Sequence, residues 1–244
     1  MNVLGSGRVA AGEYNEKISI SGRGKIDGNI RCNELSCSGS VHSAGNVECL
    51  ENISISGSAH FDKSIIAKNV SVSGSTHVDG DIKASGSVKI SGTARCKGNI
   101  TCSLLSSSGS VEIGGETEAD EISISGRITC AGLMNAEKIS ISLEGFNAPG
   151  KIGSIGGSEI RIYNSRNGAK INSMPLLKRI VGGDVMLTVD DSIEGDLIAL
   201  ECVKAQRVVG RIVAIGANCD VELVQYSEEI EIDPNARVGK YEKI

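Results

Sequence analysis

The sequence predicts an all-β protein, a three-sided parallel β-solenoid with 17–18 residues in each coil. Three observations lead to this fold: a short motif repeated at regular intervals, glycines at constant offsets from that motif, and alternation of apolar with polar residues. Alternation indicates strands because successive side chains of a strand point to opposite faces. A repeat of this length is typical of solenoids, in which each coil packs on the next.

The motif Ile-Ser-Ile-Ser-Gly sets the length of the coil. Eight near-copies follow one another in the first part of the chain, each 17 or 18 residues after the last. The extra residue of the longer steps falls near the third corner, where it lengthens a turn without reversing the inward face. The copies begin at Ile18, Leu35, Ile53, Val70, Val88, Leu105, Ile122 and Ile139.

Alignment on the motif glycine brings the other positions of the coil into columns. A second Gly stands six residues later in most coils, an aliphatic residue two further on, and Cys or Ala two beyond that. We expect the glycines at corners, because Gly adopts backbone conformations that residues with a Cβ resist. Small inward columns agree with an aromatic content of 2% and predict a narrow core without room for aromatic rings.

The cysteines of this part of the chain occupy inward positions and form no CxxC pair, so we expect buried, reduced, structural thiols. They are Cys32, Cys37, Cys49, Cys96, Cys102 and Cys130.

The regular pattern ends after Leu143, and the sequence predicts five segments. These are an N-terminal tail over residues 1–17, a regular solenoid over 18–143, an irregular insertion with a basic loop over 144–179, a shorter solenoid over 180–233, and a C-terminal tail over 234–244. Within the insertion we expect one short strand at residues 160–162. Its basic stretch, 161–179, is either a solvated loop or a contact for anionic lipid or a partner, and contains Arg161, Arg166, Lys170, Lys178 and Arg179.

Composition excludes several classes of protein. An apolar fraction of 40% is too high for a disordered chain. The net charge is −5, with the excess of acidic residues in the C-terminal part. Without a strongly basic surface, nucleic acid is not an expected partner. No signal peptide and no apolar run of membrane-spanning length is visible, and we expect a cytoplasmic protein.

The SISG repeat, the Gly-x-Ile-x-Cys/Ala column and the 17–18-residue coil resemble the bactofilins, bacterial polymer-forming cytoskeletal proteins. The resemblance covers roughly residues 3–143 and 180–244, and the terminal stretch GRIVAIGANCDVELVQYSEEIEIDPNARVGKYEKI is similar to the end of longer relatives from Firmicutes. It implies a right-handed β-helix and nucleotide-independent filaments that act as scaffolds for cell shape, envelope organisation or motility. The implied partners are other copies of the chain and envelope or motility proteins.

Two features depart from the usual family pattern. The chain has almost no Pro- or Lys-rich tails, and its solenoid is longer and interrupted. Some relatives carry an apolar N-terminal segment that targets the membrane, to which only Val3 and Leu4 correspond here. A peripheral position at the inner face of the cell membrane therefore stays an open alternative.

The three His are the strongest candidates for a functional site. His42, His60 and His77 each follow a motif glycine by three residues, on the outward side of successive coils, between Lys25 and Arg95. Stacked imidazoles bind transition metals or respond to pH. No Asp, Glu or Cys accompanies them in that column, and the flanking cations oppose a metal ion. We therefore expect an exposed ladder and predict no catalytic, cofactor-binding or metal-binding residue.

Other polar features have simpler interpretations. No G-x-x-x-x-G-K-[ST] phosphate loop occurs. The acid pairs Asp79/Asp81 and Asp190/Asp191 are expected on solvated faces. Outward serines form flat, uncharged ladders suited to lateral packing, at Ser19/Ser21, Ser36/Ser38, Ser54/Ser56 and Ser71/Ser73.

The leading functional hypothesis is a filament subunit that stacks end to end, because a terminal coil exposes backbone groups that another coil can satisfy. One alternative is a carbohydrate-active or acyltransferase-type solenoid enzyme, for which the His ladder is the relevant feature. Another is a binding scaffold that does not polymerise.

Overall fold

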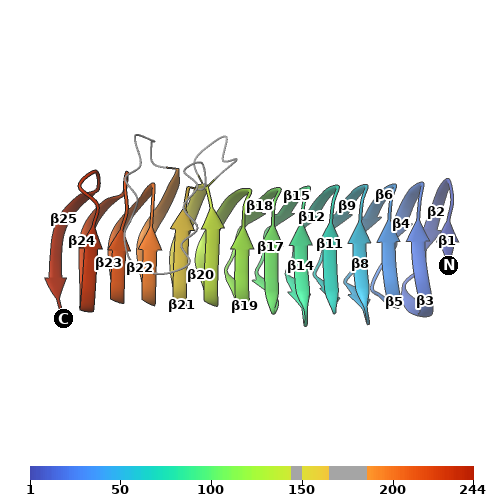
Figure 1. The fold of residues 1–244 in the computed structure, drawn as a ribbon. Coiled ribbons are helices and arrows are strands. Elements are labelled where there is room, and N and C mark those ends of the chain that lie inside the picture. Colours follow the sequence, from blue (N-terminus) through green and yellow to red (C-terminus); the bar gives the residue numbers. More distant parts are fainter. Residues whose placement is uncertain (144–149, 165–185) are drawn as a thin grey trace. The chain divides into compact units, whose positions relative to one another are not determined.

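The computed structural model describes residues 1–143, 150–164 and 186–244. Within these residues every regular element is a β-strand, neighbouring strands pair in parallel, and no helix is long and apolar enough to cross a membrane. The chain divides into two compact units, Met1–Asp120 and Glu121–Ile244. Each is a stack of parallel coils (Figure 1). The predicted all-β parallel solenoid is confirmed, and its handedness and three-sided cross-section stay predictions.

Each coil of the first unit contributes to three ladders of strands, and paired residues are 17 or 18 positions apart. The first ladder includes the starts of β3 (Gly12–Ile20) and β5 (Ile30–Cys37), then β7 (Val47–Cys49), β10 (Ile65–Ala67), β13 (Ile82–Ala84), β16 (Ile100–Thr101) and β19 (Thr117–Ile124), which continues beyond the unit. The second includes β1 (Asn2–Val3), the ends of β3 and β5, β8 (Asn52–Ile55), β11 (Asn69–Val72), β14 (Ser87–Ile90) and β17 (Leu104–Ser107). The third consists of β2 (Ser6–Val9), β4 (Arg23–Ile26), β6 (Ser40–Ser43), β9 (Ser58–Phe61), β12 (Ser75–Val78), β15 (Thr93–Cys96) and β18 (Ser110–Ile113).

The core of this unit is made of the inward columns. Burial alternates residue by residue, exposed then buried, along β6, β9 and β15. Val47, Ile65, Ile82 and Ile100 stack as one column and are at most 3% exposed. Burying each such side chain contributes about 1.5–3 kcal/mol, so the column repeats the same stabilisation in every coil.

One aromatic ring corrects the expectation that the core has no room for any. Phe61 is fully buried, between the strand partners Ser43 and Val78. Ser43 is also fully buried, and its hydroxyl donates to the carbonyl of Gly45 at 3.0 Å. The small serine in one coil leaves the volume that the phenyl ring of the next coil occupies.

The motif glycines are required for a different reason from the one expected. Among the described residues, the glycines with left-handed φ are Gly5 (φ 80°) and Gly12 (φ 150°). A Cβ on six of the motif glycines would lie far inside van der Waals distance of the carbonyl oxygen of the equivalent glycine one coil earlier. Close approach of stacked corners therefore selects Gly here. The affected residues are Gly22, Gly39, Gly57, Gly74, Gly92 and Gly109.

Another corner is held by a ladder of side-chain caps. In each coil a side-chain oxygen accepts a hydrogen bond from the backbone N–H of the next coil, which satisfies a donor that the turn leaves outside the strands. The bonds run from Asn46 N to Asn29 Oδ1 (2.8 Å), Ser64 N to Asn46 Oδ1 (3.2 Å), Asp81 N to Ser64 Oγ (2.9 Å), Asn99 N to Asp81 Oδ1 (3.0 Å) and Glu116 N to Asn99 Oδ1 (2.8 Å).

Longer strands build the second unit. They are β20 (Arg127–Ser142), β21 (Gly150–Tyr163), β22 (Leu187–Leu200), β23 (Val203–Ile215), β24 (Asp220–Ile232) and β25 (Arg237–Lys243). Each pairs in parallel with the next, usually across a β-bulge. One aliphatic column continues through five of them, at Ile139, Ile160, Ile198, Val213 and Ile230.

The expectation of an N-terminal tail over residues 1–17 is corrected by the structure, which places strands there. Strands β1, β2 and β3 lie within residues 2–20 and pair with β3, β4 and β5 respectively. Val3 and Val9 are buried. Gly5 precedes Gly22 in the stack of motif glycines, so residues 2–9 repeat the coil pattern without the serines of the motif.

The insertion and the C-terminal tail also differ from expectation. β21 occupies 14 residues of the expected insertion, because Ile152, Ile155, Ile160 and Ile162 supply buried inward positions. β25 lies in the expected tail and pairs with β24. Residues 144–149 and 165–185, which hold most of the predicted basic loop and the start of the second solenoid section, lie outside the described residues.

Substituting a motif glycine tests the close-stacking argument. We expect Gly57→Ala to lower the free energy of unfolding by about 3 kcal/mol, because the methyl group forces adjacent coils apart. Thermal unfolding followed by circular dichroism measures this. Ser58→Ala is the matched control on an exposed neighbour and should stay within about 0.5 kcal/mol of the parent. Equal stability of the two variants would contradict the argument.

A second substitution should stabilise the protein. Thr76 is 3% exposed between the strand partners Ala59 and Ala94, and within the described structure its hydroxyl has no hydrogen-bond partner. Thr76→Val keeps the shape and removes the unsatisfied group, so we expect a gain of about 1 kcal/mol in the free energy of unfolding. Thr93→Val, at an exposed position, should give no such gain. A loss of stability in Thr76→Val would refute the assignment.

Candidate functional site

The three His form the predicted ladder on the outer face of the first unit. His42, His60 and His77 lie on β6, β9 and β12 as direct strand partners. The ring centroids of His42 and His60 are 5.4 Å apart, and those of His60 and His77 are 4.8 Å apart. Their side chains are between 27% and 50% exposed. The coil repeat alone therefore brings the three imidazoles within contact distance.

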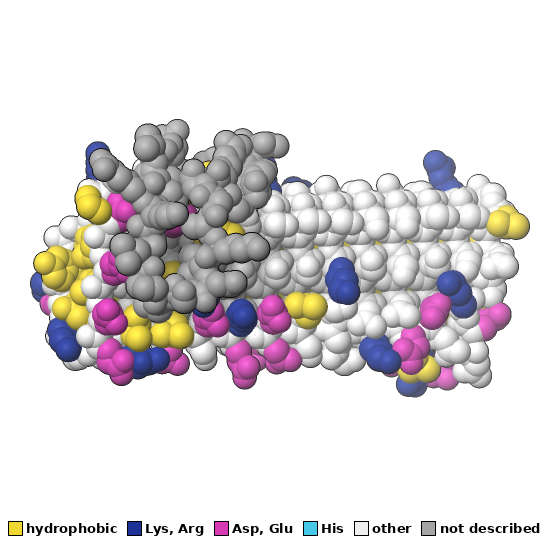
Figure 2. Space-filling model, in the orientation of Figure 1, with side chains coloured by type: hydrophobic (Ala, Val, Ile, Leu, Met, Phe, Trp, Pro, Cys, Tyr) yellow, Lys and Arg dark blue, Asp and Glu magenta, His cyan; other side chains and the backbone are white. Residues whose placement is uncertain are grey.

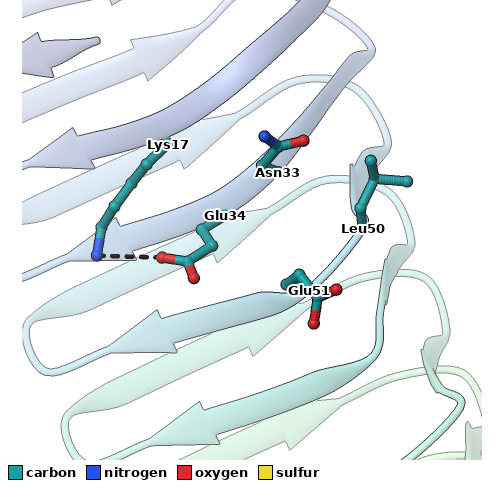
Figure 3. Close-up of a pocket in the computed structure, with 5 residues that line it drawn as sticks. All are labelled: Lys17, Asn33, Glu34, Leu50 and Glu51. Carbon is teal, nitrogen blue, oxygen red and sulfur yellow. Dashed lines mark ion pairs between the residues drawn. The ribbon is translucent and has the colours of Figure 1, made fainter.

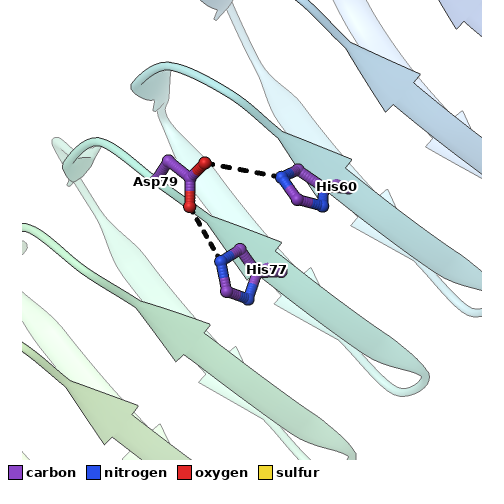
Figure 4. A group of neighbouring side chains, drawn as sticks. All are labelled: His60, His77 and Asp79. Atoms are coloured by element: carbon purple, nitrogen blue, oxygen red, sulfur yellow. Dashed lines mark hydrogen bonds and ion pairs between the residues drawn. The ribbon is translucent and has the colours of Figure 1, made fainter.

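Two carboxylates join this ladder, which corrects the expectation that no acid accompanies the His. Asp62 Oδ1 lies 2.8 Å from Nε2 of His42 and 3.3 Å from Nε2 of His60. Asp79 lies 2.8 Å from Nε2 of His77 through Oδ1 and 3.5 Å from Nε2 of His60 through Oδ2 (Figure 4). Each Asp directly follows the last residue of a strand, and its carboxylate contacts the His side chains. The His-x-Asp spacing at His60 and His77 is the sequence signal from which the contact between Asp and His could have been predicted.

The two cations that flank the ladder, Lys25 and Arg95, form ion pairs with other acidic residues. Lys25 Nζ lies 3.8 Å from Asp27, and Arg95 pairs with Glu112 at 2.7 and 2.9 Å. The cation that does reach the ladder is Lys97, whose Nζ lies 2.7 Å from Oδ1 of Asp79. The predicted opposition from Lys25 and Arg95 is thus weakened by their own acid partners.

The electrostatics of Asp79 follow from these contacts. Lys97 donates to its carboxylate, with further hydrogen bonds from His77 and His60, and together they hold the pKa of Asp79 well below its usual range. A carboxylate with such a pKa stays ionised at any physiological pH. Asp79 therefore presents a permanent negative charge to His60 and His77.

A shallow depression lies elsewhere on the first unit. It is lined by Lys17, Asn33, Glu34, Leu50 and Glu51 (Figure 3). Leu50 is 51% exposed, at one of the 18-residue coils. The charges pair with one another: Lys17 with Glu34 at 3.2 Å, and Glu51 with Lys68 at 3.1 Å. An open depression with neutralised charges offers little to orient a small ligand.

The cysteines are buried, as predicted. All eight are free thiols and none is more than 7% exposed. Burial raises the pKa of Cys96 to about 11 and that of Cys102 and Cys219 to about 12, so these thiols are protonated at neutral pH. Protonated, inaccessible thiols are poor nucleophiles and poor metal ligands.

The remaining predicted features have structural partners. Asp81 caps Asn99, and Asp190 pairs with Lys151 at 3.0 Å. Arg161 lies on β21, while the other residues of the basic stretch, Arg166, Lys170, Lys178 and Arg179, lie outside the described residues.

A buried acid in the second unit escaped the sequence analysis. Glu201 is 9% exposed, and burial raises its pKa. Its Oε2 accepts the backbone N–H of Asn164 at 3.0 Å. This bond ties the end of β21 to the corner that follows β22, which is a structural role.

The serine ladders create a face of different character. Ser38, Ser56 and Ser73 are exposed, at equivalent corners of neighbouring coils. Figure 2 shows a largely uncharged area on the visible surface of the first unit, with Lys, Arg, Asp and Glu side chains gathered mainly along its lower edge and no His. The His ladder therefore lies on another face.

Comparison with known proteins adds a family match. A family model described as "Bactofilin: Polymer-forming cytoskeletal" matches residues 3–76, 43–118 and 66–152, which together extend over more than half of the chain. An uncharacterized protein of Bacillus subtilis (strain 168), YhbE, is 32% identical over 114 residues, or 47% of this chain. The match covers 44% of that relative, less than half of its length. No solved structure matches the chain.

The charge network around Asp79 predicts a pH-dependent effect. Lys97→Met removes the main cause of the lowered pKa, so the parent should be more stable than the variant at neutral pH. The difference should shrink as the pH falls below about 4, the ordinary Asp pKa, towards the folded-state pKa, because protonation abolishes the attraction. Thermal unfolding midpoints between about pH 2 and pH 7 measure it. Lys83→Met, 4.0 Å from Asp81, is the control; a difference independent of pH would contradict the prediction.

Proposed function

The chain belongs to the bactofilin family of polymer-forming cytoskeletal proteins, and from this premise we propose that it forms filaments without nucleotide by stacking the ends of its solenoid. The observation that carries the proposal is that strands at both termini of the described structure are paired along one edge. Unpaired strand edges present rows of N–H and C=O groups that another strand can satisfy.

The last described strand offers such an edge together with apolar side chains. β25 pairs with β24, and its other edge meets no further strand among the described residues. Val238 is the partner of buried Val221, and Tyr241 is the partner of buried Val224. Tyr241 nevertheless remains 58% exposed. Inward residues of the final coil are thus left uncovered, and a second copy stacked on β25 would bury them.

The first coil offers the complementary surface. β1 and β2 pair with β3 and β4, and the start of β3 pairs with β5, so each has one partner strand among the described residues. Leu4, between β1 and β2, is 80% exposed. Hydrogen bonding along these edges and burial of such side chains would both favour association.

The serine face, in which Lys89 is the strand partner of Ser71, favours a second mode of contact. Ser56 and Ser73 lie on consecutive coils without a charge between them to repel another filament. We propose that this face supports lateral pairing of filaments, as a step separate from end-to-end growth.

The cellular role that we propose is that of a scaffold for cell shape, envelope organisation or motility. Its partners would be other copies of the chain and proteins of the envelope or of motility. The filaments would lie in the cytoplasm, either free or along the inner face of the cell membrane. The family match supports the scaffold.

A structural role also accounts for the His ladder better than the enzyme alternative. An acyltransferase-type solenoid would need its His on a loop that faces a cleft between subunits. Here each His is at an outward position of a regular strand. We propose that the protein is not an enzyme. Acyltransferase activity that is present in the parent protein and lost in a variant with His42, His60 and His77 all replaced by Ala would argue otherwise.

Charges placed on the uncovered end test the filament proposal. We expect Val238→Glu/Tyr241→Glu to abolish long filaments in negative-stain electron microscopy without nucleotide, because each junction would bury two carboxylates that have no partner on the first coil of the next copy. Circular dichroism should show an unchanged β-fold, since both side chains are partly or largely exposed.

Ser40→Glu/Thr93→Glu is the control, since it adds the same two charges on exposed residues of central coils. It should leave filament length unchanged. A parent protein that stays monomeric at micromolar concentration, or filaments that persist in Val238→Glu/Tyr241→Glu, would refute end-to-end stacking.

A further inference from the structure

We propose that His60, His77 and Asp79 form a binding site for a divalent transition-metal ion on the outer face of the solenoid. Each residue offers one ligand atom, and the three atoms lie within 4.8 Å of one another. The site is separate from the solenoid ends, so it stands independently of filament formation.

The distances are close to those of a coordinated ion. Zn²⁺ binds imidazole nitrogen and carboxylate oxygen at about 2.0–2.2 Å, which places neighbouring ligand atoms of a tetrahedral site about 3.4 Å apart. Here His60 Nε2 lies 3.5 Å from Asp79 Oδ2, and His77 Nε2 lies 2.8 Å from Asp79 Oδ1. These two contacts use different oxygens of Asp79, and the three ligand atoms lie within 4.8 Å of one another, so small side-chain shifts are needed to bring them around one ion.

The repeat holds these groups in place before the ion arrives. His60 and His77 are strand partners on β9 and β12, and Asp79 directly follows β12. Ligands on paired strands lose less conformational freedom on binding than ligands on separate loops. Asp62 Oδ1 lies 3.3 Å from His60 Nε2 and is within reach as a further oxygen ligand.

The donor set selects the class of ion. Two imidazoles with a carboxylate suit Zn²⁺, Cu²⁺ or Ni²⁺, whereas Mg²⁺ and Ca²⁺ prefer all-oxygen sites. The chain has three His in all, and every one lies in this ladder. Binding that depends on His can therefore be traced to one place.

Lys97 is the group that opposes the ion. Its ammonium lies 2.7 Å from Asp79 Oδ1, and its side chain is 59% exposed and free to swing away. An incoming cation would have to displace it. Removing Lys97 should accordingly tighten metal binding. If the Lys97–Asp79 ion pair had only a structural role, its loss would lower stability without increasing the affinity for a metal ion.

Calorimetric titration of the full chain with Zn²⁺, and electron paramagnetic resonance of the Cu²⁺ form, test the site. We expect one ion per chain, nitrogen couplings in the Cu²⁺ spectrum, and no displacement by excess Mg²⁺. Asp79→Asn and His77→Gln should each weaken Zn²⁺ binding at least about tenfold, the scale on which disturbed metal sites lose affinity. Lys97→Met should strengthen it about tenfold, because a unit charge near the ion is removed.

Asp27→Asn and Lys25→Met are matched controls, two coils away on the same face, and should leave the affinity unchanged. Circular dichroism checks that each variant is folded. Zn²⁺ affinity unaffected by His77→Gln and Asp79→Asn would overturn the proposal, as would Cu²⁺ signals without nitrogen couplings. A Lys97→Met variant that binds Zn²⁺ no tighter than the parent would also count against it.

Discussion

The close spacing of successive coils is the constraint on which the rest of the structure depends. At the motif corner the backbones approach so closely that only Gly fits, and the glycine column runs from Gly5 to Gly109. This approach lets each coil hydrogen bond with the next and lets Val and Ile side chains stack without gaps. A bulkier corner would separate the strands, and the ladders, the core and the side-chain caps would be lost together.

Stacking also converts a repeated residue into a line of identical groups. Asn29, Asn46 and Asn99 cap the backbone of the following coil, and exposed serines repeat at equivalent corners. The same rule assembles the His ladder, although each His is 17 or 18 residues from the next. A solenoid can therefore build a site from residues that are distant in the chain without a loop or a cleft.

The ends and the flank of such a protein can serve different purposes. At the ends, strands with one partner among the described residues and uncovered inward residues such as Tyr241 form the surface that we propose for association with another copy. On the flank, His60, His77 and Asp79 form a compact cluster of ligands. Neither feature disturbs the other, because each coil contacts mainly its neighbours.

The coil length, the inward columns, the buried cysteines and the stacking of His42, His60 and His77 were predictable from the residues alone, because periodicities of 2 and of 17–18 can be read directly from them. The folded chain was needed to show which strands continue the solenoid where the motif is lost, as in residues 2–9 and β21, because there the pairing with a neighbouring coil defines the strand. It likewise decided that Phe61 fits over Ser43 and that Asp62 and Asp79 turn towards the His. Those outcomes depend on volumes and distances between coils, which no single repeat contains.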